Sequence, residues 1–276
     1  EFLKPGSAYS AYMYLFHHRQ WKHNHRMKRF YTQLVRSVPK TDWGIEQCMI
    51  FDIGANQGDT TDYFRFAADQ VLCIEPDHRS ADRLRERFSG LNNVRVKEGA
   101  VDDMSGYSIL HVDPDHPAFN TLSSRWKRHV EETLEHRFEQ SYVVETWTLD
   151  ELIDRYGLPV YIKLDVEGSE LHALNGLSRA VPYISFEANL EVFREEASHC
   201  VRRISSLSPE TDFMYSFSEG FRHDLSAWIS PDSMSDVLRC TDSPFVEIMA
   251  RLQRIDPRSG EQEKARELVP EGELMS

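Results

Sequence analysis

Short apolar runs alternate with segments of helical periodicity along most of the chain. The runs end at glycine, proline or acidic residues, which is typical of buried parallel strands. The segments between them carry apolar residues three or four positions apart, as amphipathic helices do. In the first hundred residues the strands are expected at 49–53, 71–76 and 94–96, with helices at 60–68 and 80–88. This β-α-β-α-β alternation predicts a parallel sheet with helices on both faces.

The alternation is interrupted between residues 111 and 141 and then resumes. Residues 111–120 are rich in Pro, Asp and His and predict a loop, whereas 124–140 predict a charged surface helix. Thr148 and Glu151 have the spacing of a capping box, which predicts a helix beginning at 149. Further strands are expected at 142–146, 160–165, 183–187, 212–217 and 244–250, the last two antiparallel, with helices at 149–156 and 169–177.

Both ends of the chain differ from this central part. Residues 7–38 place aromatic and aliphatic side chains at helical spacing among His, Lys and Arg, and Pro39 and Gly44 close the segment. The tail from 256 is charged and poor in aromatics, which is typical of a flexible segment. We therefore divide the chain into a helical extension (1–44), an α/β domain (45–255, with an insertion at 111–141 expected on the substrate side) and a flexible tail (256–276).

Composition argues against a membrane-spanning or disulfide-rich protein. The 276 residues are 40% hydrophobic, enough for a buried core, but no apolar run approaches the roughly 20 residues of a spanning helix. The four cysteines form no C-x-x-C pair, so we expect buried reduced thiols, no zinc site built from them, and a cytoplasmic location. The chain begins Glu1-Phe2 without a methionine or a signal peptide, which we interpret as a piece trimmed from a longer protein.

Charge is spread unevenly along the chain. The net charge is −13, but residues 1–40 hold eight Lys or Arg and one acid, so the remainder carries −20. An acidic body argues against nucleic acid as a partner, because phosphate repulsion opposes binding. For the basic segment 1–40 four roles stay open: peripheral contact with an anionic membrane, contact with an acidic partner, a lid or oligomer element, and a helix docked on the acidic core, which we favour.

The turn after the first strand carries the first candidate chemistry. Asp52-x-Gly54-x-x-x-Gly58 places two glycines where the backbone turns sharply and a ligand can approach closely. Asn56 and Asp59 stand where a dinucleotide fingerprint needs its second and third glycines, and no Gly-Lys-Ser/Thr of a phosphate loop follows. An acidic turn without lysine suits a cationic ligand, and S-adenosylmethionine carries both an ammonium and a sulfonium. We expect Asp52, Gly54, Asn56 and Gly58 to shape the methionine end of such a site.

Two more acidic residues extend this site. Glu75 follows Asp52 by 23 residues, at the end of the second strand, where a carboxylate can accept hydrogen bonds from both hydroxyls of a ribose. Asp102 follows the third strand and is placed to accept from an adenine amino group, although capping of its own loop is a rival role.

Five blocks of sequence together resemble the FkbM family of methyltransferases. They occur in order over about residues 48–190, at 51–58, 74–76, 148–152, 162–170 and 184–187, and the Lys163-x-Asp165-Val-Glu167-Gly-x-Glu170 block is the most specific. The resemblance implies a Rossmann-like class I methyltransferase domain with a seven-stranded, mostly parallel sheet and helices on both faces. It also implies S-adenosylmethionine as methyl donor and O-methylation of a hydroxyl on a sugar, glycan or natural product.

The acceptor is expected beyond the carboxyl ends of the next strands, where open α/β sheets bind their ligands. Asp165 and Glu187 end two neighbouring strands, and Lys163 shares a strand face with Asp165. Methyl transfer needs positioning and, for a hydroxyl acceptor, a base. Asp165 is the candidate for orienting the acceptor or taking its proton, with Glu187 and Lys163 beside it.

A divalent metal is a second interpretation of the same carboxylates. Asp165 and Glu187, with Glu167, offer oxygen ligands that would acidify a hydroxyl. We favour a metal-free site, since carboxylates at strand ends also arise from helix capping, and helix-dipole electrostatics explain Glu167 and Glu170. Five histidines are possible general bases, and the sequence does not choose among them: His116, His129, His136, His199 and His223.

Other interpretations of the site and of the function also stay open. By the family resemblance, residues 120–124 line the acceptor pocket, with a plain helix N-cap at Ser123 or Ser124 as the rival. The methyl acceptor is a peptide or an amine in one alternative. In another, the chain is a non-catalytic module that binds a nucleoside with the same fold.

Overall fold

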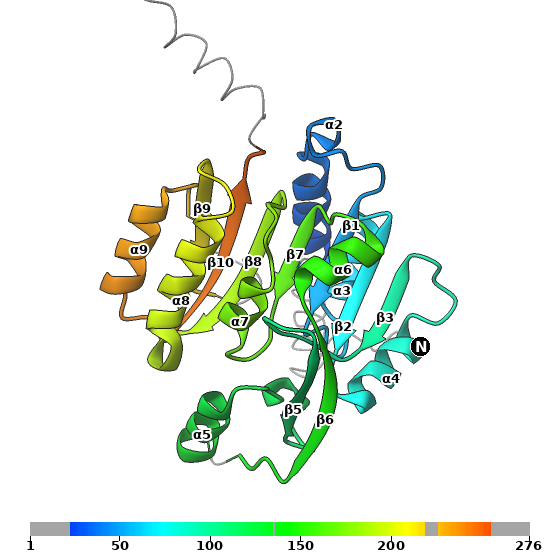
Figure 1. Cartoon of the computed structure of the whole chain (residues 1–276), viewed down its shortest axis with the longest axis vertical. Coiled ribbons are helices and arrows are strands. Elements are labelled where there is room, and N and C mark those ends of the chain that lie inside the picture. Colours follow the sequence, from blue (N-terminus) through cyan, green and yellow to red (C-terminus); the bar gives the residue numbers. More distant parts are fainter. Residues whose placement is uncertain (1–22, 135, 219–225, 255–276) are drawn as a thin grey trace, which may run out of the picture.

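A computed structural model describes residues 23–134, 136–218 and 226–254, so the expectations for 1–22 and for the tail 256–276 lie outside the described residues. Seven strands form the main sheet in the order β3-β2-β1-β7-β8-β10-β9 (Figure 1). Their bounds in that order are Val94–Glu98, Gln70–Glu75, Met49–Ile53, Tyr161–Leu164, Tyr183–Asn189, Phe245–Leu252 and Thr211–Ser216.

Strand direction in the main sheet follows the prediction for β10 but not for β9, which runs in the same direction as β8. β10 runs antiparallel to its neighbours β8 and β9, and the remaining pairs are parallel. The chain builds outward from β1 to β3 and then returns to place β7 on the other side of β1. Ligands of open α/β sheets bind at such a reversal of strand order. The seven-stranded, mostly parallel sheet is therefore confirmed, and the reversal places a site at the ends of β1 and β7.

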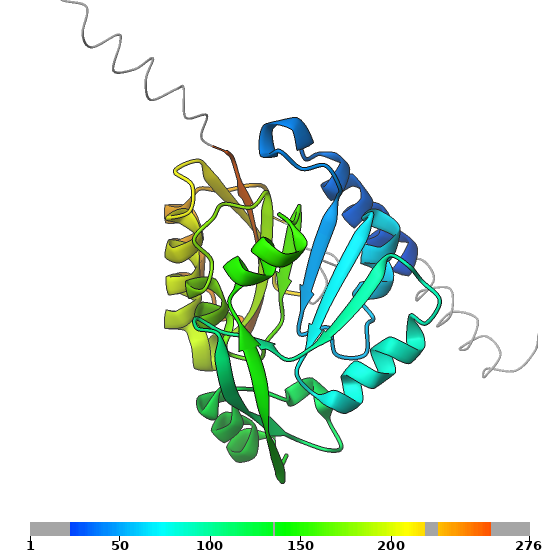
Figure 2. The same cartoon turned by 45° about the vertical axis from the view of Figure 1, so that its right-hand side comes forward.

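Helices cover both faces of this sheet (Figure 2). The short connections of the first half are α3 and α4, and those of the second half are α6 and α7, close to the predicted positions. The structure adds α8, which packs on β8 and β10, and α9, which packs on β9; the sequence analysis placed neither. The bounds are Thr61–Ala67 (α3), His78–Arg87 (α4), Leu149–Tyr156 (α6), Glu170–Asn175 (α7), Leu190–Ser205 (α8) and Pro231–Cys240 (α9).

The described part of the N-terminal segment packs on the core. Residues 23–36 are helical, and α2 (Lys40–Trp43) follows, ending at Gly44. Met27 and Tyr31 are almost fully buried, and Lys28 lies 3.2 Å from Asp62 of α3. This stretch is therefore a docked helix that contributes to the core, as we favoured for it.

A second, three-stranded sheet, which was not expected, brackets the insertion 111–141. Its order is β4-β6-β5, with bounds Ala100–Val101, Gln140–Trp147 and Gly106–Val112. His111 lies in β5 rather than in a loop, and the strand expected at 142–146 pairs here and not in the main sheet. The two-residue period of a strand does not say which sheet the strand joins, which is why the sequence missed this.

The helix expected over 124–140 is shorter than predicted. α5 spans Ser124–Thr133, and Phe138 turns back to pack with Trp126 and Val130 of this helix. A 3-10 turn, η1 (Pro117–Phe119), joins β5 to α5. In Figure 1 the small sheet and α5 lie together at the lower end of the main sheet.

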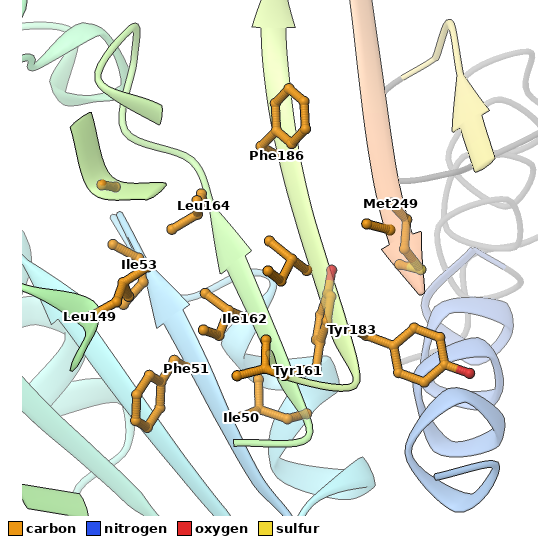
Figure 3. Packing of buried hydrophobic residues seen from close by; sticks show 14 of the residues in the cluster. Ile50, Phe51, Ile53, Leu149, Tyr161, Ile162, Leu164, Tyr183, Phe186 and Met249 are labelled. Carbon is orange, nitrogen blue, oxygen red and sulfur yellow. The ribbon is translucent and has the colours of Figure 1, made fainter. Parts of the chain in front are cut away.

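The core lies on both sides of the main sheet. Figure 3 shows Phe51 and Ile53 of β1 near Leu149, the first residue of α6. On the opposite face Tyr31 packs edge-on against Phe64, and Phe64 packs edge-on against Tyr161. Alternation along the strands puts Asp52 and Lys163 on this second face, at its carboxyl end.

Two expectations drawn from composition concern the cysteines and membrane-spanning helices. Cys48, Cys73 and Cys200 are buried free thiols, as expected, whereas Cys240 is exposed. Among residues 23–134, 136–218 and 226–254, no helix combines the length and apolarity needed to cross a membrane.

Candidate active site

The turn after β1 packs directly on the end of β7. Gly54 has φ +79°, and a Cβ built on it would lie 1.8 Å from the carbonyl oxygen of Asp165. Only glycine fits this approach, so the turn and the Asp165 loop are fixed to each other. Asn56 also has positive φ, at 47°, and its N–H donates to Glu75 Oε2 at 2.7 Å. The predicted close approach at Gly54 is thus one between two segments of backbone.

Gly58 packs against Leu84 and Phe88, whereas it was expected to shape the ligand site. Its φ is +84°, and a Cβ there would lie 2.7 Å or less from the rings or methyls of Phe88 and Leu84. The residue is not among those lining the cavities described below. Gly58 therefore lets the turn pack beneath α4 and does not itself shape the ligand site.

Asp52 is a buried carboxylate on β1. Its Oδ2 accepts a 2.5 Å hydrogen bond from Thr61 Oγ1, and its Oδ1 has no partner among the described residues. Burial raises the pKa of Asp52, while the ammonium of Lys163 opposes that rise. The unpartnered oxygen and that of Asn56 both belong to residues that line one cavity, so they fit a ligand with hydrogen-bond donors.

Glu75 lies at the end of β2, as predicted. The carboxylate is 5% exposed and accepts from two backbone N–H groups, Asn56 at Oε2 and Asp77 at Oε1, at 2.7 and 2.9 Å. Burial raises the pKa of Glu75 to about 7 in spite of these two hydrogen bonds. Each oxygen keeps a second lone pair for a ligand hydroxyl.

The side chain of Asp102 is hydrogen-bonded within its own loop. Its Oδ1 accepts from the neighbouring Asp103 N–H at 2.9 Å and lies 3.4 Å from His172 Nδ1. The residue does not line the apolar cavity, which takes Gly99, Ala100 and Val101 from this stretch instead. The rival role of loop capping describes Asp102 better than contact with adenine, because the chain turns away after β4.

Lys163, Asp165 and Glu187 form one ion-pair group. Lys163 Nζ lies 2.5 Å from Asp165 Oδ2 and 3.6 Å from Glu187 Oε1, with the lysine nearly fully buried. Burial alone would lower the pKa of Lys163, but the carboxylates of Asp165, Glu187 and Asp52 outweigh it and hold the pKa well above its usual value. These three residues thus lie together, as expected, and Lys163 is the shared counter-charge of the two carboxylates.

Glu170 holds the loop after β7 in place through hydrogen bonds to its backbone, a role that was not expected. Glu170 Oε1 accepts from the N–H groups of Val166 and Gly168 at 3.3 and 3.2 Å. Burial raises the pKa of Glu170 to about 7. Glu167 has φ 51°, and its pKa is raised by burial and then by the charge of Asp165. The two glutamates shape a strained turn, which goes beyond favourable helix-dipole electrostatics.

Three cavities meet at this loop. The apolar cavity, of about 120 Å³, includes Ile53, Ile74, Glu75, Leu110 and Leu122 in its lining. The acidic cavity, of about 570 Å³, is lined by the carboxylates of Asp52, Asp59, Asp62, Asp165, Glu167, Glu187 and Glu247, with Lys163 and Arg87. The tryptophan cavity, of about 170 Å³, includes Trp126, Asn189, Phe193 and Phe245. Asp165 and Glu167 line all three cavities.

The insertion contributes the wall of the apolar cavity. Pro117, Asn120 and Thr121 line it, and Thr121 Oγ1 donates to the carbonyl of Glu167 at 2.7 Å. Asn120 Nδ2 donates to Asp77 Oδ2 at 3.1 Å, which ties the insertion to the start of α4. Ser123 caps α5 by accepting from Trp126 N–H at 3.2 Å, so the rival N-cap role holds for this residue.

Two site residues were missed altogether. Glu247 of β10 lies opposite Glu187 in the antiparallel register and is 1% exposed. Trp126 is buried, and its Nε1 has no hydrogen-bond partner within the described part of the chain. An acid inside the apolar run 245–250 was the available signal for Glu247, whereas nothing in the sequence pointed to the indole.

Comparison with known proteins shows the family to which the chain belongs. The model of the methyltransferase FkbM domain matches residues 52–221. The 2-O-methyltransferase NoeI of Sinorhizobium fredii is 29% identical over 212 residues, covering 71% of this chain and 84% of that protein.

Solved structures of methyltransferases are more distant. The precorrin-6y C5,15-methyltransferase of Geobacter metallireducens has a TM-score of 0.42 at 9% identity, covering 82% of this chain and 86% of that one. The O-methyltransferase of Bacillus cereus, solved with S-adenosylhomocysteine (SAH), has a TM-score of 0.38 at 14% identity. The match covers 82% of this chain and 80% of that one. Both TM-scores are low, so the fold assignment rests on the strand order given above.

Proposed function

Since the chain belongs to the FkbM family of methyltransferases and is an S-adenosylmethionine-dependent enzyme, we propose that it methylates a hydroxyl of a sugar, glycan or natural product. The acceptor would lie against Asp165 and Glu187, and the cofactor would lie across the ends of β1, β2 and β7.

The residues present fit the cofactor. The apolar cavity offers aliphatic walls for adenine, and the second lone pairs of Glu75 suit a ribose diol. Toward the acidic cavity, the unpartnered oxygens of Asp52 and Asn56 suit an ammonium group. S-adenosylmethionine, when bound, supplies an electrophilic methyl group on its sulfonium.

The meeting of the three cavities at Asp165 and Glu167 is the observation that carries the proposal. A methyl donor and its acceptor must approach each other in line, with the reacting atoms about 3–3.5 Å apart. Two residues that border donor and acceptor space at once are placed to orient that approach.

In the proposed mechanism Asp165 accepts a hydrogen bond from the acceptor hydroxyl and takes its proton, while the acceptor oxygen would gain the methyl group and the methyl–sulfur bond of the donor would break, leaving a neutral thioether. Lys163 holds the Asp165 carboxylate in place through the 2.5 Å contact. Glu187, 3.6 Å from the same ammonium, orients the acceptor from the neighbouring strand. The carboxylates also favour the cationic donor over its neutral product electrostatically.

Support for a hydroxylated acceptor comes from the tryptophan cavity. A buried indole N–H usually finds a partner, and a hydroxyl of the acceptor would supply one for Trp126. NoeI is named as a 2-O-methyltransferase, which agrees with this acceptor class. The net charge of −13 supports a partner other than nucleic acid.

We propose that the site works without a divalent metal. The position between Asp165 and Glu187 is taken by the ammonium of Lys163, so a second cation there would be repelled. Activity should therefore not depend on a divalent metal added to the assay.

Transfer of a labelled methyl group to a panel of acceptors tests the function. The panel contains oligosaccharides with vicinal diols, amino sugars and short peptides. We expect one methyl group on an oligosaccharide oxygen, seen by mass spectrometry and, if a vicinal hydroxyl is methylated, by resistance to periodate cleavage. A methyl group found on nitrogen, or transfer to peptides alone, would overturn the hydroxyl assignment in favour of an amine or peptide acceptor.

A further inference from the structure

Asp113, His116 and His136 come together at the far side of the insertion, outside the site described above. Asp113 directly follows β5, His116 precedes η1, and His136 lies in the segment after α5. Asp113 Oδ2 lies 3.5 Å from His116 Nδ1 and 3.2 Å from His136 Nδ1. One ligand atom from each residue lies within 4.8 Å of the others.

The carboxylate of Asp113 is fixed by its own loop. Its Oδ1 accepts from the N–H groups of Asp115 and His116 at 2.9 and 3.0 Å, and the Asp113 N–H donates to Asn120 Oδ1 at 2.9 Å. The residue is 3% exposed. With Oδ1 engaged by the backbone, Oδ2 is left to face the two imidazoles.

The His136 imidazole is packed among other rings, whereas that of His116 is half-exposed. The centroids of the two imidazoles lie 4.2 Å apart in an edge-on arrangement, and Phe119 packs 4.7 Å from the ring of His136. Rigid ligands lower the cost of assembling a metal site, because less side-chain entropy is lost when the ion binds.

The spacing of these atoms is compatible with tetrahedral coordination of one ion. Zinc bonds of about 2.0–2.2 Å to nitrogen and oxygen put neighbouring ligand atoms of a tetrahedron about 3.3 Å apart. The two separations from Oδ2, 3.2 and 3.5 Å, bracket that value. The longer one exceeds the range of an ordinary N–H···O hydrogen bond.

We propose that Asp113, His116 and His136 bind a divalent transition-metal ion, of which zinc best matches the donors. Two imidazole nitrogens and one carboxylate oxygen are ligands that zinc accepts, whereas calcium and magnesium prefer oxygen alone. Three protein ligands leave a fourth position for water.

This site would stabilise the wall of the apolar cavity. Pro117 and Ala118 follow His116 directly and line that cavity, while His136 lies beyond α5. An ion shared by His116 and His136 closes the intervening chain into a loop, and such closure restricts the unfolded state. The metal therefore acts on the stability of the insertion and takes no part in methyl transfer.

Zinc binding to the full chain tests the proposal. After removal of metals by a chelator, zinc is titrated against a chromophoric competitor, and cobalt is added separately to read the coordination from its absorption spectrum. We expect one ion per chain at this site, a four-coordinate cobalt spectrum, and a melting temperature that rises with zinc.

Two variants and one control identify the ligands. His136→Ala should weaken zinc binding by more than about 100-fold, since even residues that only support a ligand contribute 10–100-fold. Asp113→Asn should do the same, with circular dichroism checking that both variants fold. His199→Ala, at a side chain of α8 that is 44% exposed, should leave zinc affinity unchanged. No zinc binding, or equal affinity in wild type and folded His136→Ala, would overturn the proposal.

Discussion

Asp52 and Lys163 lie opposite each other in register on the neighbouring parallel strands β1 and β7. Both are almost completely buried, and the lysine also neutralises Asp165 and Glu187 at the ends of β7 and β8. One ammonium therefore serves carboxylates from three adjacent strands. Removing the lysine would leave buried negative charges facing one another. The site therefore needs Lys163 for its stability.

The first prediction concerns that ammonium. Lys163→Met should lower the free energy of unfolding by about 3–5 kcal/mol, the usual cost of removing one partner of a buried ion pair. Urea denaturation measures the change. Lys127→Met is the matched control, because Lys127 forms an exposed i,i+4 pair with Glu131 and should cost less than about 1 kcal/mol. Equal costs for the two variants would contradict the assignment of Lys163 as the shared counter-charge.

The second prediction separates chemistry from binding. Asp165→Asn keeps the shape of the side chain but cannot take a proton, so turnover should fall by roughly 10²–10⁴-fold. Affinity for SAH, measured by calorimetry, should change little. Asp59→Asn is the control: Asp59 lines the acidic cavity but is exposed, and its loss should leave turnover nearly intact. If turnover and SAH affinity fall together in Asp165→Asn, Asp165 serves the cofactor and is not the base.

The third prediction follows from the pKa of Glu75, which burial raises from 4.5 to about 7. Between these values the folded chain holds a proton that the unfolded chain has lost, so stability falls as pH rises from about 4.5 to 7. A shift of this size corresponds to about 3 kcal/mol. Glu75→Gln should remove this fall, as read from urea denaturation across pH 4.5–8.

Glu170 provides a control for the pH effect. Its pKa is also raised by burial to about 7, so Glu170→Gln should remove a similar and separate part of the pH dependence. The two residues differ in their link to the cofactor, since Glu75 lines the apolar cavity and Glu170 does not. Glu75→Gln should weaken SAH binding more than Glu170→Gln, and the reverse order would refute the ribose assignment.

The fourth prediction compares two glycines that share φ +79°, Gly54 and Gly90. A Cβ on Gly90 meets nothing within 4 Å, so Gly90→Ala should cost only the strain of a left-handed alanine, about 1–2 kcal/mol. A Cβ on Gly54 would lie 1.8 Å from the Asp165 carbonyl, so Gly54→Ala should cost more than about 4 kcal/mol and abolish SAH binding. Similar stability of the two variants would mean that the two loops are not in contact.

The parts of the fold that local sequence specifies were predictable. β1, β2 and β7 are buried on both faces, so their near-continuous apolar runs mark them directly. The capping box also worked in part: Thr148 accepts from Glu151 N–H at 3.1 Å. The Glu151 carboxylate accepts from Ser105 and does not return to Thr148, because the small sheet brings Ser105 there.

The candidate site was predicted where it depends on strand ends, and missed where it depends on long-range pairing. Asp52, Glu75 and Asp165 follow from the order of strands and turns. Glu247 enters only because β10 pairs antiparallel with β8, and Trp126 only because α5 folds back toward the main sheet. The surroundings of Asp102 were not predicted, because the chain leaves the main sheet after β3 and enters the small sheet as β4, and no local pattern records that departure.

The position of β10 between β8 and β9 has a consequence for how the chain folds. β9 is made before β10 during synthesis, yet β10 is the one strand of the main sheet with which it pairs; its other described partner is the segment 226–229, through a single antiparallel bridge between Phe213 and Ile229. The edges of β8 and β9 that face β10 therefore stay unpaired until residue 252 has emerged. Late, non-local pairing of this kind slows folding and leaves strand edges open to association with other chains. A chain ending before Phe245 would expose β8 and β9 permanently, and aggregation rather than loss of one function would be its first symptom.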